Sequence, residues 1–303
     1  SFARRWRAFP FPARRSRGNI VAEVIAVFGV SHAPLLITRA EEAPAEVREK
    51  VFSTYERVGR TLIDQDVEAL IVFGNDHIQT FSPDCFPALA VGAAPRHLNV
   101  SSEGWMPKVN GGRRGDADLG LHLAVVLLDH GFDPLLCREM DLDHSIVTPI
   151  HRMGDPPIPL VPILQNTVAP PLPPAERSYA LGLAVRRALE DYDRIDRVGV
   201  VGTGAMSHWI GTPEMGRIDE GWDQTAIELL SEGRANQLAG WSQKKIDAGG
   251  NGANEVRNWI AAAAVAGNTR AETWVYEPEP VWFTGITIMK WPVGAALDPD
   301  RSS

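Results

Sequence analysis

Short apolar runs alternate with longer amphipathic stretches along almost the whole 303-residue chain. The apolar runs are typical of buried strands and fall near residues 22–30, 68–74, 86–92, 133–139, 158–164, 196–202, 271–276 and 283–289. The amphipathic stretches have helical spacing and fall near residues 44–65, 116–130, 174–191, 219–231 and 252–266. Because such alternation is typical of a sheet covered by helices, the sequence predicts a single α/β domain, with a central mixed sheet flanked by helices on both faces.

Two loop-like stretches interrupt this pattern. Residues 93–115 are rich in glycine and predict a long irregular excursion, and loops of that length usually serve a function. Residues 168–174 contain four prolines and predict a stiff connector into the next helix.

The two ends differ in character from the middle of the chain. Six arginines and no acidic residue lie within the first 18 residues, although the whole chain has a net charge of −8. This stretch lacks the apolar core of a secretory signal. We predict a basic, disordered arm over residues 1–20, one folded domain over residues 21–295 and a flexible tail over residues 296–303.

Composition argues against several classes of protein. The chain without its arm is strongly acidic, and nucleic-acid affinity depends on basic groups that neutralise phosphates. No apolar stretch approaches the roughly 20 residues that span a bilayer. Cys85 and Cys137 offer neither a paired metal spacing nor a disulfide framework, and both lie in apolar runs typical of small core residues. We therefore expect a soluble protein of the reducing cytoplasm, with no nucleic-acid or membrane partner.

Four histidines each follow a run that predicts a buried strand. They are His32, His77, His144 and His208, and the segment before His77 reads Gly74-Asn75-Asp76. Ligands of an open α/β sheet gather beyond the carboxyl ends of its strands. We therefore predict that the four side chains line one shared polar pocket.

Two of these histidines and one glutamate are candidate metal ligands. His32 precedes Pro34, so its backbone is held in a turn, and a hydrogen bond at the strand end would account for it equally well. Glu255 lies in the first turn of the helix near 252–266, where an acid also complements the helix dipole. Two histidines and one carboxylate form the facial triad of non-haem Fe(II) enzymes, which leaves coordination positions open. Spacing alone does not choose between these interpretations of His32, His77 and Glu255.

Other interpretations of these motifs are weaker. The segment Gly202-Thr203-Gly204-Ala205-Met206-Ser207 lacks the last glycine of a dinucleotide loop and the lysine of a phosphate loop. A hydrolase built on Ser207 lacks the Gly-x-Ser-x-Gly turn. Asn75-Asp76-His77 is similar to a metallophosphatase loop, so a metal-dependent hydrolase is one alternative, although the paired aspartates of a two-metal site are missing. A non-enzymatic binding protein on the same fold is the other alternative.

Six motifs, in order along the chain, resemble those of the class III extradiol ring-cleavage dioxygenases. They are Ser31-His32-Ala33-Pro34, Asn75-Asp76-His77, Ser102-Glu103-Gly104-Trp105, Asp141-Leu142-Asp143-His144, Gly202-Thr203-Gly204-Ala205-Met206-Ser207-His208 and Asn254-Glu255-Val256. The resemblance runs from about residue 22 to about residue 290 and is strongest to the catalytic subunit of protocatechuate 4,5-dioxygenase. It implies an α/β sheet flanked by helices, in agreement with the pattern of strands and helices.

The resemblance implies a role for each of five residues. His32, His77 and Glu255 would be the Fe(II) ligands. His208 would be the catalytic acid/base, and His144 a second active-site histidine near substrate and dioxygen. The implied reaction is Fe(II)-dependent extradiol (meta) cleavage of a catechol-type ring by dioxygen, which gives a ring-opened semialdehyde, and the domain over residues 21–295 would be catalytic.

One departure from the family pattern bears on the substrate. Where the protocatechuate branch has a Ser-Asn pair that grips the ring carboxylate, this chain has Pro280 and Val281 if Gly285 is aligned. A carboxylate bound directly to the ring would lose its partners there, and an unpaired buried charge is costly. The segment Pro278-Glu279-Pro280-Val281-Trp282 instead resembles the dihydroxyphenylpropionate dioxygenase branch. We expect a small aromatic diol, an aminophenol or a hydroxypyridone as substrate, and a homo-oligomer that a small separate lid subunit could cover.

Overall fold

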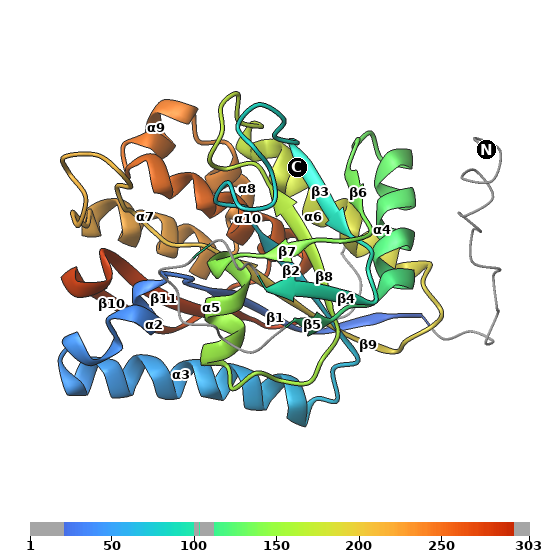
Figure 1. The fold of residues 1–303 in the computed structure, drawn as a ribbon, viewed down its shortest axis with the longest axis horizontal. Helices are drawn as coiled ribbons and strands as arrows, with labels where there is room; N and C mark the ends of the chain where they lie inside the picture. The colour runs from blue at the N-terminus through green and yellow to red at the C-terminus, as the bar shows by residue number, and fades with distance from the viewer. Residues whose placement is uncertain (1–20, 100–102, 104–111, 294–303) are drawn as a thin grey trace.

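An eight-stranded sheet forms the centre of the structure, a computed structural model that describes residues 21–99, 103 and 112–293 (Figure 1). Strands β1, β9, β2 and β8 are parallel to one another, whereas β11 is antiparallel to β1 and β3 is antiparallel to β8. The sheet is therefore mixed, as predicted. In spatial order its strands are β10 (Glu272–Glu279), β11 (Thr284–Trp291), β1 (Glu23–Val30), β9 (Arg197–Thr203), β2 (Ala69–Gly74), β8 (Leu160–Gln165), β3 (Leu89–Gly92) and β6 (Leu135–Cys137).

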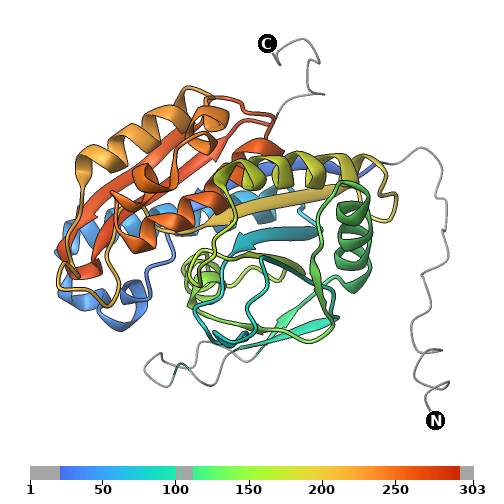
Figure 2. The same cartoon turned by 90° about the horizontal axis from the view of Figure 1, so that it is seen from above.

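Helices cover both faces of this sheet, which confirms the predicted three-layer arrangement (Figure 2). One face carries α4 (Ala117–Asp129), α6 (Ala175–Glu190), α7 (Glu220–Ser231), α8 (Ala235–Ala239) and α10 (Val256–Val265), and the other carries α2 (Leu35–Thr38), α3 (Ala45–Asp64) and α5 (His144–Arg152). Successive strand residues alternate between the two resulting cores, because side chains along a strand point to opposite faces. In β1, for example, Val27 packs in one core and Phe28 in the other.

Several short elements are not predicted by the sequence pattern. Strands β4 (Arg96–Asn99), β5 (Arg113–Arg114) and β7 (Asp141–Leu142) form a second, three-stranded sheet, and the first two lie in the excursion expected over residues 93–115. They are too short for alternation to show. Helix α5 contains Pro149, a residue that argues against a helix interior. The remaining short helices are η1 (Ala40–Glu42), α9 (Gln243–Asp247), η2 (Asn251–Glu255) and η3 (Pro280–Trp282).

Helix α10 lies unusually close to the sheet. A Cβ atom on Gly202 of β9 would stand 2.5 Å from the main-chain oxygen of Asn258 in α10, so a larger residue would push the helix away. Trp259 of the same helix is fully buried against the strands. This close packing brings the start of α10, and Glu255 directly before it, to the carboxyl ends of β1 and β9.

The cysteines correct one expectation and confirm another. Cys137 is buried, as expected, but Cys85 is exposed, so its assignment to the core is wrong. Strand β3 begins only at Leu89, and Cys85 therefore lies in the connection before it. Neither cysteine forms a disulfide.

The predicted arm over residues 1–20 and tail over residues 296–303 lie outside the described residues. Within the described part of the chain, no helix combines the length and the apolar character needed to cross a membrane.

Candidate active site

His32 lies two residues beyond the end of β1 and is 2% exposed. Its Nδ1 lies 3.2 Å from the hydroxyl of Thr203, at the end of the neighbouring parallel strand β9. This contact orients the ring so that Nε2 lies 3.1 Å from Oε2 of Glu255.

His77 lies just beyond β2 and is held by a carboxylate. Both its main-chain N–H and its ring Nδ1 lie within hydrogen-bond distance of the same Asp143 oxygen, at 2.6 and 2.9 Å. Asp76 fixes the turn by accepting hydrogen bonds from the main-chain N–H groups of residues 79, 80 and 81. With Nδ1 engaged, the Nε2 atom of His77 lies 3.1 Å from Oε1 of Glu255.

Glu255 is the last residue of η2 and is 2% exposed. One carboxylate oxygen faces His32 and the other faces His77. The main-chain N–H of Ala205 donates to Oε2 at 2.8 Å, and the Asn75 amide donates to Oε1 at 3.4 Å. The carboxylate is therefore fixed between the two imidazoles, as a metal ligand would be, instead of lying free at the helix terminus.

These buried groups shift one another's pKa values. Burial alone would raise the pKa of Glu255, but His32 and His208 outweigh it and hold that pKa well below its usual value. Burial opposes a charge on His77 as well, yet the Asp143 and Glu255 carboxylates raise its pKa well above the usual value. For His32, burial outweighs Glu255, and its pKa is lowered. The two imidazoles therefore differ, because the carboxylates favour the protonated form of His77 whereas burial favours the neutral form of His32.

The donor set formed by His32, His77 and Glu255 fits a divalent metal ion. Donor atoms about 2.1 Å from one ion, and at right angles around it, would stand roughly 3 Å apart, close to the two 3.1 Å separations at Glu255. Among the described residues, one group of three whose ligand atoms all lie within 4.8 Å of one another consists of His32, His77 and His144, without Glu255. A second group with this spacing consists of Glu103, Asp143 and His144. Imidazole with carboxylate is a donor set for iron, zinc or copper.

His144 reaches the site by a different route from the one that the sequence predicts. The run before it forms β6, which is parallel to β3 and therefore runs against β8 and β2, so its carboxyl end lies at the opposite edge of the sheet. His144 is instead the first residue of α5, after β7. Glu103 accepts from its main-chain N–H at 3.0 Å and lies 2.5 Å from its Nδ1. The ring stacks on His77, with centroids 4.0 Å apart.

His208 follows β9, as predicted, and its tautomer is set by the backbone. Its Nδ1 lies 2.9 Å from the carbonyl oxygen of Met206, which can only accept, so Nδ1 carries the hydrogen. In the neutral ring, Nε2 is then the proton acceptor, and it lies 3.8 Å from Oε2 of Glu255. Gly252 makes room for the ring, because a Cβ atom there would stand 2.0 Å from Nε2.

A cavity of about 390 Å³ joins these side chains. All five predicted site residues line it: His32, His77, His144, His208 and Glu255. Much of the remaining wall is apolar and comes from Pro34, Leu35, Trp209, Ile210, Met215, Trp282 and Phe283. The lining contains no lysine or arginine among the described residues. The cavity can therefore enclose a small, largely apolar molecule next to a metal ion.

The sequence does not predict the partners that orient the site histidines. Asp143, Thr203 and Glu103 each lie within one of the six motifs, but the motifs do not reveal their contacts. Their only signal is an acid or hydroxyl placed at a strand end or just before a site histidine.

Comparisons with known proteins agree with this geometry. The family model described as the catalytic LigB subunit of aromatic ring-opening dioxygenase matches residues 26–287. A 2,3-dihydroxyphenylpropionate/2,3-dihydroxicinnamic acid 1,2-dioxygenase from Mycobacterium sp. (strain MCS) is 30% identical over 328 residues, which cover 87% of this chain and 97% of that protein. The protein of the same name from Mycolicibacterium smegmatis is 29% identical over 313 residues, with the same coverage.

A solved structure supports the fold alone. The crystal structure of the uncharacterized protein JW3007 from Escherichia coli K12 matches with a TM-score of 0.52 and 15% identity, over 88% of this chain and 99% of that one. The family match covers most of the chain and favours ring cleavage over the hydrolase and binding-protein alternatives. The chain belongs to the family of catalytic LigB subunits of aromatic ring-opening dioxygenases, and it is a ring-cleaving dioxygenase.

Proposed function

We propose that this dioxygenase uses Fe(II), held by His32, His77 and Glu255, to cleave a catechol-type ring beside its hydroxyl groups. The product would be a ring-opened semialdehyde that contains both atoms of dioxygen. The observation that carries the proposal is the Glu255 carboxylate, which faces both imidazoles at 3.1 Å beside a cavity that two further histidines line. When bound, Fe(II) supplies a Lewis acid with open positions at which a catechol and dioxygen can meet.

His208 is the proposed acid/base. Its Nε2 has no hydrogen in the neutral ring and faces the cavity, so it can take a proton from a substrate hydroxyl and return it later. An imidazole suits this exchange near neutral pH.

His144 is proposed to orient substrate and stabilise charge. Glu103 engages its Nδ1 and the ring lines the cavity, so a substrate oxygen there would meet the ring at Nε2. A hydrogen bond from that atom would stabilise negative charge on the oxygen in the transition state. The apolar wall would exclude water from the reacting groups.

The cavity favours a catechol with an apolar or distal acidic substituent. No lysine or arginine lines the described wall, so a carboxylate on the ring itself would be buried without a cation. Two arginines lie over aromatic rings of the wall: Arg39 is 5.6 Å from the centre of the Phe283 ring, and Arg217 is 4.5 Å from the centre of a Trp209 ring. A carboxylate at the end of an apolar spacer could meet them at the rim. The relatives named for 2,3-dihydroxyphenylpropionate act on a compound of this kind.

A substrate panel tests this function. The protein is loaded with Fe(II) anaerobically, mixed with catechols, aminophenols or hydroxypyridones, and exposed to labelled dioxygen. We expect a yellow ring-fission product with both labelled atoms from at least one diol, and faster turnover of 3-substituted catechols than of protocatechuate. Phosphate release from phosphoesters without ring cleavage would support the hydrolase, and metal-free binding of catechols without turnover would support the binding protein.

The assembly and location are expectations of the same proposal. We expect a homo-oligomer in the cytoplasm, and a small separate lid subunit if the catalytic chain alone turns over slowly. Sedimentation of the purified chain, with and without substrate, measures the oligomeric state.

A further inference from the structure

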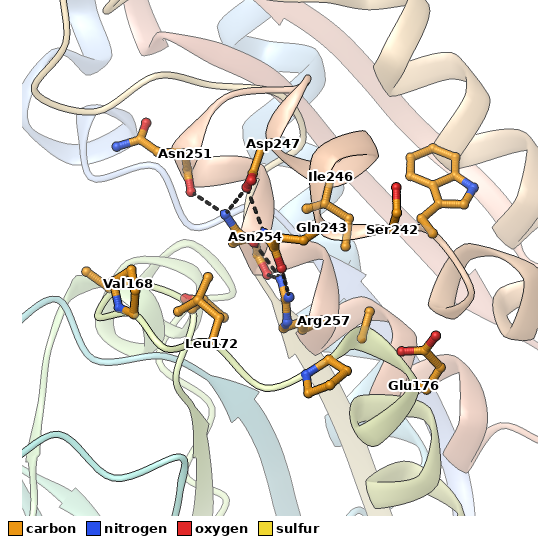
Figure 3. Close-up of a pocket in the computed structure, with 15 residues that line it drawn as sticks. Val168, Leu172, Glu176, Ser242, Gln243, Ile246, Asp247, Asn251, Asn254 and Arg257 are labelled. Atoms are coloured by element: carbon orange, nitrogen blue, oxygen red, sulfur yellow. Dashed lines mark hydrogen bonds between the residues drawn. The ribbon is translucent and has the colours of Figure 1, made fainter.

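The turn that ends in Glu255 separates two cavities. The active-site cavity lies on one side of η2, and a second cavity of about 740 Å³ lies on the other. The 168–174 connection, α9 and the beginning of α10 enclose this second cavity (Figure 3). Asn254 and Arg257 line it, whereas Glu255, between them in sequence, lines the active site.

Arg257 ties three segments together behind the turn. Its Nη1 donates to both the main-chain oxygen and the side-chain Oδ1 of Asn254, at 3.2 and 2.7 Å. Its Nη2 donates to Gln243 of α9 at 2.8 Å, and its Nε donates to the main-chain oxygen of Pro173 at 2.9 Å. The guanidinium reaches these partners from three separate nitrogen atoms in one rigid plane, whereas lysine has a single nitrogen at the end of a flexible chain.

The amide N–H groups of Asn254 and Gln243, beside Arg257, each donate two hydrogen bonds (Figure 3). The Asn254 amide donates to Asp247 at 3.2 Å and to the main-chain oxygen of Asn251 at 3.0 Å. The Gln243 amide donates to Asp247 at 2.7 Å and to Asn254 at 2.8 Å. Polar networks in which every member is satisfied are rigid. The residue directly before Glu255 is therefore fixed in both its main chain and its side chain.

Stability alone does not account for this arginine. Arg257 is 1% exposed and forms no ion pair with a described carboxylate, although Asp247 and Glu176 lie close enough to favour its charge. Burial lowers the pKa of Arg257 to about 10, so it remains charged at neutral pH. A buried cation without an ion-pair partner costs folding free energy, and an apolar residue of similar size often stabilises such a position better.

We propose that Arg257 is a positioning residue that fixes the η2 turn and thereby places the Glu255 carboxylate between His32 and His77. This proposal rests on the proposed role of Glu255 as a metal ligand. The same turn carries Gly252 against the His208 ring, so its displacement would disturb both groups. Residues that orient metal ligands in this way typically change metal affinity about 10–100-fold when they are replaced.

The test compares two arginines that form hydrogen bonds at opposite ends of α10, Arg257 at its start and Arg186 at its far end. Arg257→Lys replaces the guanidinium at the start of α10 with an ammonium group. Arg186→Lys is the matched control, because Arg186 is half-buried and donates to the main-chain oxygen of Val265 at the far end, at 2.9 Å. Each full-length variant is titrated with Co(II), which reports affinity and, through its absorption spectrum, ligand geometry. The melting temperature of each metal-free protein is measured in parallel.

We expect Arg257→Lys to weaken Co(II) binding about 10–100-fold and to alter the Co(II) spectrum, while its metal-free melting temperature stays close to that of Arg186→Lys. Arg186→Lys should bind Co(II) like the wild type. Gln243→Ala removes one exposed partner of the guanidinium, and its loss of affinity should be smaller. If Arg257→Lys does not fold, Gln243→Ala decides the question.

Wild-type affinity and spectrum in a folded Arg257→Lys protein would overturn the positioning role and leave the proposed function intact. An equal loss of affinity in Arg186→Lys would also overturn it. Failure of the wild type itself to bind Co(II) or Fe(II) would overturn the proposed function and this inference with it.

Discussion

The two cavities on either side of the η2 turn satisfy their polar groups in opposite ways. In the active-site cavity, His32 and His77 both face the single carboxylate of Glu255, and all three have shifted pKa values. In the cavity behind the turn, Arg257 donates to neutral amide and main-chain oxygens, and the Asn254 amide donates to the Asp247 carboxylate. The first arrangement places one carboxylate between two imidazoles, as the proposed metal site requires, whereas the second joins side chains that are already hydrogen-bonded to one another. Under the two proposals, the metal affinity would arise on one side of the turn and the geometry of the site would be set from the other.

The largest expected effect is the loss of the shared carboxylate. Glu255→Gln removes the negative charge and one ligand, so we expect metal affinity to fall by more than about 100-fold, beyond the range of second-sphere changes, and ring cleavage to disappear. Metal content after dialysis measures this, with Glu272→Gln on the exposed edge of β10 as the control. A Glu255→Gln protein that kept metal at full occupancy would show that the active-site cavity does not depend on this carboxylate.

His208→Phe should separate chemistry from metal binding. The ring of phenylalanine fills the same space but cannot accept a proton, so we expect turnover to fall about 10²–10⁴-fold while metal affinity changes little. Rapid-mixing turnover and Co(II) titration on the same sample measure the two effects. Undiminished turnover would refute the acid/base role.

Asp143→Asn should weaken metal binding, although Asp143 contacts a proposed ligand and is not one itself. His77 would lose the charged acceptor at its Nδ1, and we expect metal affinity to fall about 10–100-fold. The effect should resemble that of Arg257→Lys, which acts from the opposite side. An affinity equal to that of the wild type would mean that the Asp143 contact does not orient the ring.

Metal binding by the wild type should depend on pH through His77. Without metal, the Asp143 and Glu255 carboxylates raise the pKa of this imidazole and so favour its doubly protonated form, and the proton on Nε2 must leave before that nitrogen can coordinate. We expect release of about one proton per metal bound, and affinity that falls about tenfold for each pH unit below neutrality. Titration calorimetry in buffers of different ionisation enthalpy counts the protons. Metal uptake without proton release would contradict the assigned state of His77.

The smallest expected effect concerns Arg39 and Arg217, which lie over aromatic rings of the active-site cavity wall. Arg39→Gln and Arg217→Gln should each raise KM about 2–5-fold for a catechol with a distal carboxylate, the size of an exposed ion pair, and leave KM unchanged for the neutral alkyl analogue. Equal changes for both compounds would mean that these arginines only support the wall.

Local patterns were sufficient to predict the layers of the fold. The strand runs are strongly apolar and the helices strongly periodic, so α3 and β2 lie within one residue of their predicted bounds. Helix α5 and the small sheet could not be predicted in this way, because Pro149 and two- to four-residue strands leave no periodic signal.

The candidate site was predicted in part from pattern and in part from family resemblance. Strand ends located His32, His77 and His208, whereas His144 was selected for an incorrect reason, since β6 ends at the other edge of the sheet. Spacing could not decide whether Glu255 binds a metal ion or only complements the dipole of the helix. The contact of His32 with Thr203 joins residues 171 positions apart, and the Arg257 network depends on which loops meet. Such contacts are set by tertiary packing, which a single sequence does not encode in a readable pattern.

The most direct test of the central claim is anomalous X-ray scattering at the iron edge from crystals loaded anaerobically with Fe(II). We predict one peak within bonding distance of Nε2 of His32, Nε2 of His77 and the carboxylate of Glu255. A peak held instead by Glu103, Asp143 and His144, or no iron at all in crystals that still turn over catechols, would contradict it.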